Sequence, residues 1–404
     1  MGSCGSLYMG GLIMRKLKLG IFGLWRGGSF VHIINAMENA EVHAICDFDE
    51  ERLAFMTKEC PEGVIACKNF DELLDSGIEA VLLCNYFHQH AACAIKAMKR
   101  GIHVFSECTA AVTMKECVEL CEAVEETGCK YMLAENYPFS AALLEFERLQ
   151  TEGTLGRILY AEGEYNHTGT RETLASLTPG KYHWRAFLPR TYYVTHSLGP
   201  LMHVTKQMPV QVSAFAVHSD VLEQYDDFRH NYDAFAMMSC ITDGGALFRF
   251  TGCAHMGSHS GYRVCGEYGS VETGRSLGGN VNLVYHDWTV PEGMKTSQTY
   301  APSWPANGEL AEKAGHGGGD FWTVYHFVNY VLNGVDPFFD VYRGCCMSAV
   351  AILAWRSCLE NGKVYAIPDF RNKQERDAWR HDDLTPFPDE NGNVTLPCAV
   401  PRKK

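Results

Sequence analysis

The 404-residue sequence lacks an excess of basic residues, and it also lacks long apolar runs. It holds 35 lysines and arginines against 48 aspartates and glutamates, which gives a formal net charge of −13. Nucleic acids and anionic membrane surfaces bind basic patches, so this balance disfavours both as partners. No apolar run has the length of a membrane span, and no secretory hydrophobic segment follows the N-terminus. We therefore expect a protein without a nucleic-acid or membrane partner.

The Cys-x-x-Cys motif is also absent, although the sequence contains 17 cysteines. Most of them lie inside apolar runs, where a free cysteine packs as a small hydrophobic side chain. This pattern predicts a reducing, cytoplasmic compartment and no disulfide framework. The histidine pair His255 and His259 has no partner set at metal-ligand spacing, so no metal is predicted.

The first residues allow two interpretations. Met1 to Ser6 fits the pattern for N-terminal myristoylation, with a cysteine that could be acylated. It is equally a glycine-rich leader before a second possible start at Met14. We favour the leader, and expect residues 1–13 to be disordered.

A strand, a glycine turn, a helix and a second strand follow in that order. Residues 17–22 form a short apolar run that ends at Gly23, and helical periodicity begins at Ser29. Residues 42–46 form the second strand, and Asp47 follows it directly. A dinucleotide-binding unit needs this order, because the turn and helix N-terminus receive the pyrophosphate and the acid binds ribose hydroxyls.

The turn departs from the usual glycine fingerprint. Trp25 stands where the second glycine is expected, although Gly23 and Gly27 keep the turn glycine-rich. A plain βαβ turn remains the alternative, but the acid at Asp47, roughly 20 residues beyond the turn, favours a nucleotide. Asp47 would repel a 2′-phosphate, so we expect NAD, while Arg26 leaves NADP open.

Strands and helices alternate after Asp47 as far as Glu135, which predicts a doubly wound α/β domain over residues 14–136. Asn69 is expected to cap a helix, and the continuous apolar run 78–84 is typical of a buried parallel strand. Expected helices are 50–58, 69–76, 91–99 and 115–127, and further expected strands are 64–66, 103–106 and 130–134.

The pattern changes in residues 137–404, which we expect to form an α+β domain. A helix over 140–151 precedes an alternating strand over 158–167 and a loop over 168–192. Consecutive strands then predict a largely antiparallel sheet with one packed and one open face, and the open face would form a wall of a substrate cleft. Those strands are 210–217, 235–242, 246–252, 262–267 and 281–285, and two helices follow at 320–332 and 344–359.

Four short segments, in this order, resemble the Gfo/Idh/MocA family of NAD(P)-dependent oxidoreductases over about residues 17–370. They are Cys84-Asn-Tyr-Phe-His-Gln-His90, Gly101-Ile-His-Val-Phe-Ser-Glu107-Cys108-Thr109, Gly315-His316-Gly-Gly-Gly-Asp320 and Ile367-Pro-Asp-Phe370. The resemblance implies a Rossmann domain, an α+β domain with an open-faced sheet, and C-terminal helices that return to the first domain. It also implies a homo-oligomer that pairs through that sheet.

Cys108 is the main departure from that family, which usually has Glu-Lys-Pro where this sequence has Glu107-Cys108-Thr109. In ordinary dehydrogenases of the family the lysine lies between the substrate hydroxyl and the nicotinamide and assists proton transfer. Cysteine has neither a permanent charge nor the same reach. Another residue must therefore manage the hydroxyl proton.

A branch with the same departure is glycoside hydrolase family 109, whose members are NAD-dependent glycosidases of the α-N-acetylgalactosaminidase type. The similar segments are Ser106–Ala111, Glu135-Asn136, Ala161–His167, Trp184-Arg185 and Tyr193–Pro200. The spacing between Arg185 and Tyr193 is shorter than in those enzymes, so the sugar specificity is not carried over.

The resemblance implies cleavage by transient oxidation of the sugar at C3, elimination across C1 and C2, addition of water and return of the hydride. His196 is the expected base for the C3 hydroxyl, because its ordinary pKa suits proton exchange at neutral pH. Tyr165 and Tyr193 are both candidates for the C2 proton or the leaving group, and the sequence does not separate them. Simple packing is the alternative for each of the three.

Arg185 and Glu135 are expected to anchor sugar hydroxyls, with a surface ion pair as the alternative for Glu135. His316 is a further substrate-binding candidate, because it lies in a glycine-rich turn before a helix. We expect Asn85, His90, Glu107 and Cys108 to lie near the nicotinamide end of the cofactor, with a structural role as the alternative for His90.

The leading hypothesis is thus a cytoplasmic, NAD-bound enzyme that acts on a sugar or glycoside by hydride abstraction at C3. The first rival is an NAD(P)-dependent sugar or cyclitol dehydrogenase, or a 3-keto-glycoside reductase, with net turnover of nicotinamide. The second rival is a non-catalytic NAD-binding sensor.

Overall fold

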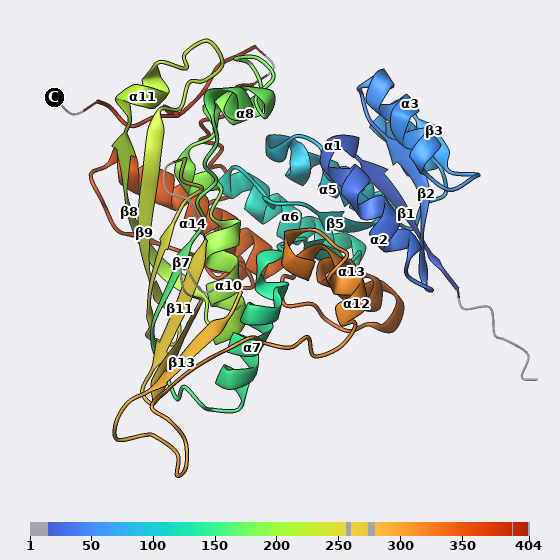
Figure 1. The fold of residues 1–404 in the computed structure, drawn as a ribbon. Coiled ribbons are helices and arrows are strands. Elements are labelled where there is room, and N and C mark those ends of the chain that lie inside the picture. The colour runs from blue at the N-terminus through green and yellow to red at the C-terminus, as the bar shows by residue number, and fades with distance from the viewer. Residues whose placement is uncertain (1–14, 256–259, 274–278, 390, 403–404) are drawn as a thin grey trace, which may run out of the picture.

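The computed structural model describes residues 15–255, 260–273, 279–389 and 391–402. The predicted leader, residues 1–13, lies outside this range. Two sheets organise the chain, and Figure 1 shows them on opposite sides of a layer of helices. Helix α14 in this layer contacts both β6 of the first sheet and β8 of the second.

The first sheet has six parallel strands in the order β3-β2-β1-β4-β5-β6. This is the doubly wound arrangement in which a dinucleotide binds at the carboxyl ends of the central strands, where the strand order reverses. The reversal lies between β1 and β4. The strands are β1 (Leu17–Phe22), β2 (Ala40–Cys46), β3 (Ile65–Cys67), β4 (Ala80–Leu83), β5 (His103–Ser106) and β6 (Tyr131–Leu133).

Helices connect these strands, and the first of them starts earlier than predicted. Helical structure begins directly after Gly23 instead of at Ser29, because Gly23 adopts a φ of 91° that closes the turn within one residue. Asn69 caps α4 as expected, by accepting from the backbone N–H of Glu72. The helices are α1 (Leu24–Gly27), η1 (Gly28–Phe30), α2 (Val31–Asn35), α3 (Glu50–Glu59), α4 (Phe70–Asp75), η2 (Phe87–Gln89), α5 (His90–Met98) and α6 (Met114–Thr127).

The second sheet has nine strands in the order β14-β13-β12-β11-β7-β10-β9-β8-β15. Every adjacent pair is antiparallel except β7 and β10, which run parallel, so the predicted largely antiparallel sheet is confirmed. Its strands are β7 (Ile158–Glu164), β8 (Pro209–His218), β9 (Asp233–Thr242), β10 (Leu247–Thr251), β11 (Gly261–Gly266), β12 (Gly269–Thr273), β13 (Val281–Tyr285), β14 (Ser297–Tyr300) and β15 (Tyr365–Ala366).

The segment predicted as a loop over 168–192 is partly helical, which corrects that expectation. It contains α8 (Arg171–Ser176), α9 (Trp184–Phe187) and η4 (Arg190–Tyr192). Each is one or two turns long, too short for an apolar periodicity to be recognised. Helix α10 (Thr195–Thr205) follows and was not predicted, because all of its residues are buried and it has no polar face.

Helices from the end of the chain return to the first sheet. In α13 (Gly319–Asn333) the ring of Phe327 stacks on Phe105 of β5 with centroids 4.8 Å apart. In α14 (Val341–Leu359) the hydroxyl of Ser348 lies 2.8 Å from that of Thr109. The remaining helices are η3 (Tyr137–Phe139), α7 (Ala141–Thr151), α11 (Asp220–Glu223), α12 (Gly308–Ala311), η5 (His316–Gly318) and α15 (Lys373–Asp377).

The outer face of the second sheet carries exposed apolar side chains on neighbouring strands. Phe215 of β8 pairs with Met237 of β9, and Ile241 of β9 pairs with Leu247 of β10. Most large apolar side chains lie inside a folded protein. A group of them exposed on adjacent strands is therefore unusual for a monomer surface. In the described part of the chain, none of the helices combines the length and apolar character that crossing a bilayer requires.

Candidate active site

A cavity of about 270 Å³ lies between the two domains, against the carboxyl ends of β4 and β5. Asn85, Glu107 and Cys108 line it from the loops that follow these strands. Tyr193 and His196 line it from the second domain. The reversal of strand order in a doubly wound sheet is where its ligands bind, so the cavity lies where a cofactor and a substrate would meet.

His196 is held in this cavity by a buried carboxylate. Its Nδ1 lies 3.0 Å from each carboxylate oxygen of Glu135, and its Nε2 lies 3.3 Å from the hydroxyl of Tyr193. Glu135 can only accept at Nδ1, so that nitrogen carries the proton and Nε2 is the free acceptor that faces Tyr193. This tautomer leaves Nε2 available to take a proton from a substrate hydroxyl.

Glu135 is fully buried, with no exposed area, and its predicted contact with a sugar hydroxyl stays a prediction. Besides His196, its carboxylate accepts from the backbone N–H of Tyr137 at 3.1 Å and from the thiol of Cys108 at 3.3 Å. These donors fix the carboxylate below the imidazole. Glu135 is therefore a positioning residue for His196.

Aromatic rings fix the plane of the His196 imidazole. The ring of Tyr137 stacks on it with centroids 4.3 Å apart, and the ring of Tyr165 meets it edge-on at 4.7 Å. The hydroxyl of Tyr262 donates to the backbone carbonyl of His196 at 2.6 Å. The contacts of Tyr137 and Tyr262 with His196 were not predicted. The sequence contains 19 tyrosines, and no local motif singles out these two.

The two tyrosines predicted for catalysis differ in their electrostatic surroundings. Burial raises the pKa of both hydroxyls, since it disfavours the charged phenolate. At Tyr193 the guanidinium of Arg185 opposes this rise in pKa. Three other neighbours of Tyr193 add to the rise, namely Cys253, Cys108 and Glu107. At Tyr165 the neighbours, which include Tyr193, all raise the pKa further. Tyr193 is thus the better placed of the two to release a proton.

Arg26 connects the glycine turn to the cavity through two carboxylates. Its Nε donates to Glu107 at 2.8 Å, and its Nη1 and Nη2 donate to Asp320 at 3.0 and 2.7 Å. His316 and Asn136 also donate to Asp320, at 3.0 and 2.7 Å. Burial opposes ionisation of Asp320, but the hydrogen bonds from His316 and Arg26 outweigh it and hold the pKa of this carboxyl below its usual range.

The residues at the reversal of strand order fit a dinucleotide. A Cβ at Gly23 would come within 2.4 Å of the Cys84 carbonyl, and one at Gly27 within 2.4 Å of Ile21, so both positions require glycine. The side-chain oxygen of Asn85 is buried, lines the cavity and has no hydrogen-bond partner in the described residues, which leaves an acceptor for a ligand.

Asp47 and Trp25 occupy different surroundings. Asp47 is buried at the end of β2, where its carboxylate accepts from the backbone N–H of Leu24 at 2.6 Å and of Asp49 at 2.9 Å. It therefore lies against the glycine turn, with lone pairs left for ribose hydroxyls. Trp25 is 73% exposed and packs on the guanidinium of Arg52, 4.9 Å from the ring centroid, rather than on the cavity.

His90 and Cys108 line the cavity but have partners within the protein. The ring nitrogens of His90 lie 3.0 Å from the Thr109 carbonyl and 3.1 Å from the Asn85 carbonyl, so it joins the loops that follow β4 and β5. Burial lowers the pKa of His90 and raises that of the Cys108 thiol. Both side chains are thereby kept neutral.

Part of the cavity wall was not foreseen from the sequence. Arg190 and Arg229 are buried, His255 lies beside them, and all three line the cavity together with the predicted residues Arg185 and His316. Arg190 is the first residue of η4 and Arg229 lies between α11 and β9, with no motif around either, so only the tertiary structure brings them together.

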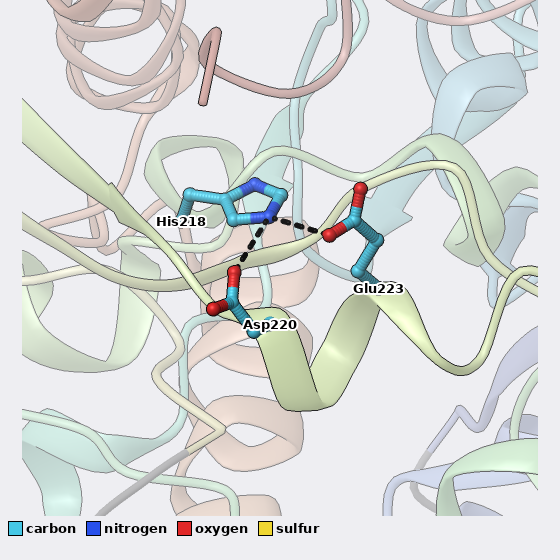
Figure 2. Close-up of side chains that lie close together, drawn as sticks. All are labelled: His218, Asp220 and Glu223. Carbon is cyan, nitrogen blue, oxygen red and sulfur yellow. Dashed lines mark hydrogen bonds and ion pairs between the residues drawn. The ribbon is translucent and has the colours of Figure 1, made fainter. Parts of the chain in front are cut away.

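A possible metal-ligand group lies elsewhere. His218, Asp220 and Glu223 converge at the end of β8 and the start of α11, as Figure 2 shows. His218 Nε2 is 3.4 Å from Glu223 and 3.8 Å from Asp220. Arg402 pairs with the same two carboxylates at 3.0 and 3.4 Å, so its cationic group already neutralises them, and none of the three lines the cavity.

Comparison with protein families gives one match for each domain. Residues 17–135 match the Gfo/Idh/MocA oxidoreductase family, NAD-binding Rossmann fold. Residues 262–379 match the C-terminal domain of glycosyl hydrolase family 109.

Curated proteins similar to this chain carry the second of these family names. A glycosyl hydrolase family 109 protein of Akkermansia muciniphila is 28% identical over 98% of this chain and 89% of its own length. An α-N-acetylgalactosaminidase of Shewanella oneidensis is 25% identical over 91% of this chain and 87% of its own length.

The fold is also similar to that of solved structures. Levoglucosan dehydrogenase in complex with NADH and levoglucosan superposes with a TM-score of 0.74, at 16% identity, over 88% of this chain and 100% of the other. Aldose-aldose oxidoreductase from Caulobacter crescentus, complexed with glycerol, gives a TM-score of 0.68 at 18% identity, over 87% of this chain and 100% of the other.

Proposed function

We propose that this enzyme, whose residues 17–135 match the Gfo/Idh/MocA oxidoreductases and whose residues 262–379 match the glycosyl hydrolase 109 C-terminal domain, cleaves a glycoside by transient oxidation at C3. The observation that carries the proposal is the position of His196. Its Nε2 lies 3.3 Å from the Tyr193 hydroxyl, in a cavity that is also lined by Cys108, the residue at the position of the lysine of ordinary dehydrogenases of this type. A neutral imidazole oriented by a carboxylate replaces that lysine as the proton acceptor.

NAD⁺, when bound, supplies the hydride acceptor for the sugar C3 and returns the hydride at the end of the cycle. His196 Nε2 takes the proton of the C3 hydroxyl as the C3–H bond breaks, which leaves a ketone at C3. Glu135 stabilises the imidazolium that forms, because its carboxylate lies 3.0 Å from Nδ1. The same imidazolium returns the proton to the C3 oxygen in the last step.

The ketone acidifies the C2 proton, and Tyr193 is the proposed group that removes it. The C2–H electrons form a C1=C2 double bond, the bond from C1 to the leaving oxygen breaks, and the Tyr193 hydroxyl passes the proton it took from C2 to that oxygen. Addition of water then places a hydroxyl on C1 and a proton on C2. Arg185 supports the role of Tyr193, since its positive charge favours the phenolate.

We propose NAD rather than NADP as the cofactor, held by residues 14–136, with residues 137–404 holding the substrate. Asp47 supports NAD, because a buried carboxylate that already accepts two backbone N–H groups would repel a 2′-phosphate. The 16 cysteines of the described residues are all free thiols, which supports a reducing, cytoplasmic compartment.

The test is a panel of nitrophenyl glycosides, each incubated with purified enzyme and NAD⁺ in deuterated water. We expect release of nitrophenol, incorporation of deuterium at C2 of the sugar product and no net formation of reduced nicotinamide. Cleavage without deuterium at C2 would exclude the elimination. Stoichiometric reduced nicotinamide would instead show a dehydrogenase, and bound NAD without any turnover would show a sensor.

We also propose that the chain forms a homo-oligomer through the outer face of the second sheet. The exposed side chains of Phe215, Met237, Ile241 and Leu247 support this, since a second copy would cover them. Light scattering of the purified protein should give a mass above that of one chain, and Phe215→Glu should lower it. A monomeric mass at micromolar concentration would contradict the proposal.

A further inference from the structure

The cavity carries an excess of positive charge. The residues that line it include four arginines but a single carboxylate, Glu107, which is paired with Arg26. In the described residues, Arg185, Arg190 and Arg229 have no carboxylate within ion-pair distance. A neutral sugar does not need such a wall.

Arg190 is buried, and all of its partners are neutral. Its nitrogens donate to the carbonyls of Leu188 and Cys253 at 3.1 Å, to Asn231 Oδ1 at 3.2 Å and to His255 Nε2 at 2.7 Å. These contacts satisfy its hydrogen-bonding groups without balancing its charge. The charge of Asp233 favours the charged form of Arg190, but Asp233 is linked to it only through the side chain of Asn231. A buried charge without a direct counter-ion is costly, so the site favours an anion nearby.

Arg229 has an unused donor. It is 2% exposed, its Nε donates to the backbone carbonyl of Asn231 at 3.1 Å, and its Nη2 is buried without a partner in the described residues. Burial and the neighbouring Arg190 lower the pKa of this guanidinium to about 9. The charge of Asp233 acts in the opposite direction, but its carboxylate already accepts from Asn231 and from the backbone N–H of Val400.

We infer that the substrate of this enzyme is a glycoside that carries an anionic substituent, and that Arg229, with Arg190 and Arg185 beside it, binds that substituent. The inference rests on the proposed action on a glycoside and adds the chemical class of the sugar. A sugar carboxylate, a sulfate ester and a phosphate ester share the required chemistry, because each accepts several charge-assisted hydrogen bonds from guanidinium groups.

The experiment is calorimetric titration of NAD-loaded enzyme with matched pairs of sugars in the gluco and galacto series. Each methyl glycoside is compared with the corresponding methyl glycosiduronate, and with its 6-sulfate and 6-phosphate. At least one anionic ligand should bind more tightly than its neutral counterpart, by about ten-fold or more. The anionic ligand that does so, whether uronate, sulfate or phosphate, identifies the substituent. Equal affinities within every pair, or no binding of any ligand, would overturn the inference.

Variants separate recognition of charge from general damage to the fold. Arg229→Gln should abolish the preference for the anionic ligand while NAD affinity is unchanged, and Arg229→Lys should retain part of it. Arg171→Gln is the matched control, because Arg171 is exposed on α8 and pairs with Asp227 outside the cavity. A preference that survives Arg229→Gln would show that this residue does not bind the substituent.

The same titrations distinguish this inference from the proposed function. Exchange of the C2 hydrogen for deuterium, followed in samples prepared in deuterated water, reports oxidation at C3 independently of affinity. Preferential binding of anionic sugars without any oxidation would contradict the proposed reaction and support the anion site. If neutral and anionic glycosides were bound with equal affinity and both were cleaved, the result would support the proposed reaction and contradict the anion site.

Discussion

His196 shows how a single side chain acquires its chemistry from its contacts. An isolated histidine side chain can adopt either of two neutral tautomers, but Glu135 at Nδ1 selects the one with a free Nε2. The stacked ring of Tyr137 prevents rotation of the imidazole away from the cavity. The proton acceptor is thus defined by residues that do not touch the substrate.

Glu135→Gln should lower kcat by about 10²–10⁴-fold while leaving the affinity for NAD unchanged. The amide can donate to Nδ1, which favours the tautomer whose Nε2 is protonated and cannot accept. The measurement is the rate of glycoside cleavage together with NAD affinity by fluorescence. Glu147→Gln is the control, because Glu147 lies 3.8 Å from another histidine of α10, His203, outside the cavity. Equal losses in the two variants would contradict a specific role.

Cys108→Ala should retain turnover within about ten-fold of the parent enzyme, because burial raises the pKa of the thiol and it cannot act as the base at neutral pH. The remaining donors to Glu135, which are His196 and the backbone N–H of Tyr137, are unchanged. Steady-state kinetics on the best glycoside of the panel measure this. A loss as large as that of Glu135→Gln would show that the thiol takes part in the chemistry.

At the scale of elements, the glycine turn sets the distance between β1 and the helix that follows. The chain passes within contact distance of the Cys84 backbone at Gly23, and α1 packs on Ile21 through Gly27. Trp25 is tolerated because its side chain points to Arg52 on the outer side. The second fingerprint position therefore does not require glycine here, whereas the first does.

Gly23→Ala should destabilise the protein by about 2 kcal/mol or more and weaken NAD binding. The added Cβ would lie 2.4 Å from the Cys84 carbonyl, and the φ of 91° is unfavourable for alanine. Gly128→Ala is the matched control, since Gly128 also has a positive φ, 67°, but nothing lies within 4 Å of the added Cβ. Thermal unfolding and NAD titration of both variants are compared. Similar effects in both would show that backbone conformation alone accounts for the loss.

At the scale of the whole molecule, the C-terminal segment ties the two domains together. Helix α14 packs between α6 and β8, and the residues after it return across α6. Arg376 of α15 is buried and pairs through both terminal nitrogens with Glu125 of α6, at 2.7 Å each. Relative motion of the domains is therefore restrained on the side away from the cavity.

Glu125→Gln should reduce the free energy of unfolding by about 2 kcal/mol at pH 7, with a smaller effect at low pH. The hydrogen bonds from Arg376 lower the pKa of Glu125 from 4.5 to about 2. Its stabilising contribution is therefore complete above about pH 4.5 and disappears as the pH falls through about 2. Denaturant unfolding of both proteins between pH 7 and pH 3 measures the difference. Glu119→Gln, on the exposed face of α6, is the control, and a difference independent of pH would contradict the assignment.

Much of the architecture was determined by local sequence. The parallel sheet followed from apolar runs of strand length, such as Leu17–Phe22 and His103–Ser106, which match β1 and β5. The second sheet was recognised from alternation, but β12, β14 and β15 were missed, because these strands are short or only weakly alternating. Helix α10 was missed because a helix buried on all sides has no amphipathic pattern.

By itself, the sequence determined the fold class, the position of the glycine turn and the presence of His196, Tyr193, Tyr165 and Arg185 near the cofactor loops. Those inferences rest on residues close together in the chain or on segments in a fixed order. Only the tertiary structure decided that the Glu135 carboxylate lies against His196, and that Arg190 and Arg229 form a cationic wall. The reason is physical: burial and the choice of hydrogen-bond partners arise from contacts between segments distant in sequence, and no local pattern encodes them.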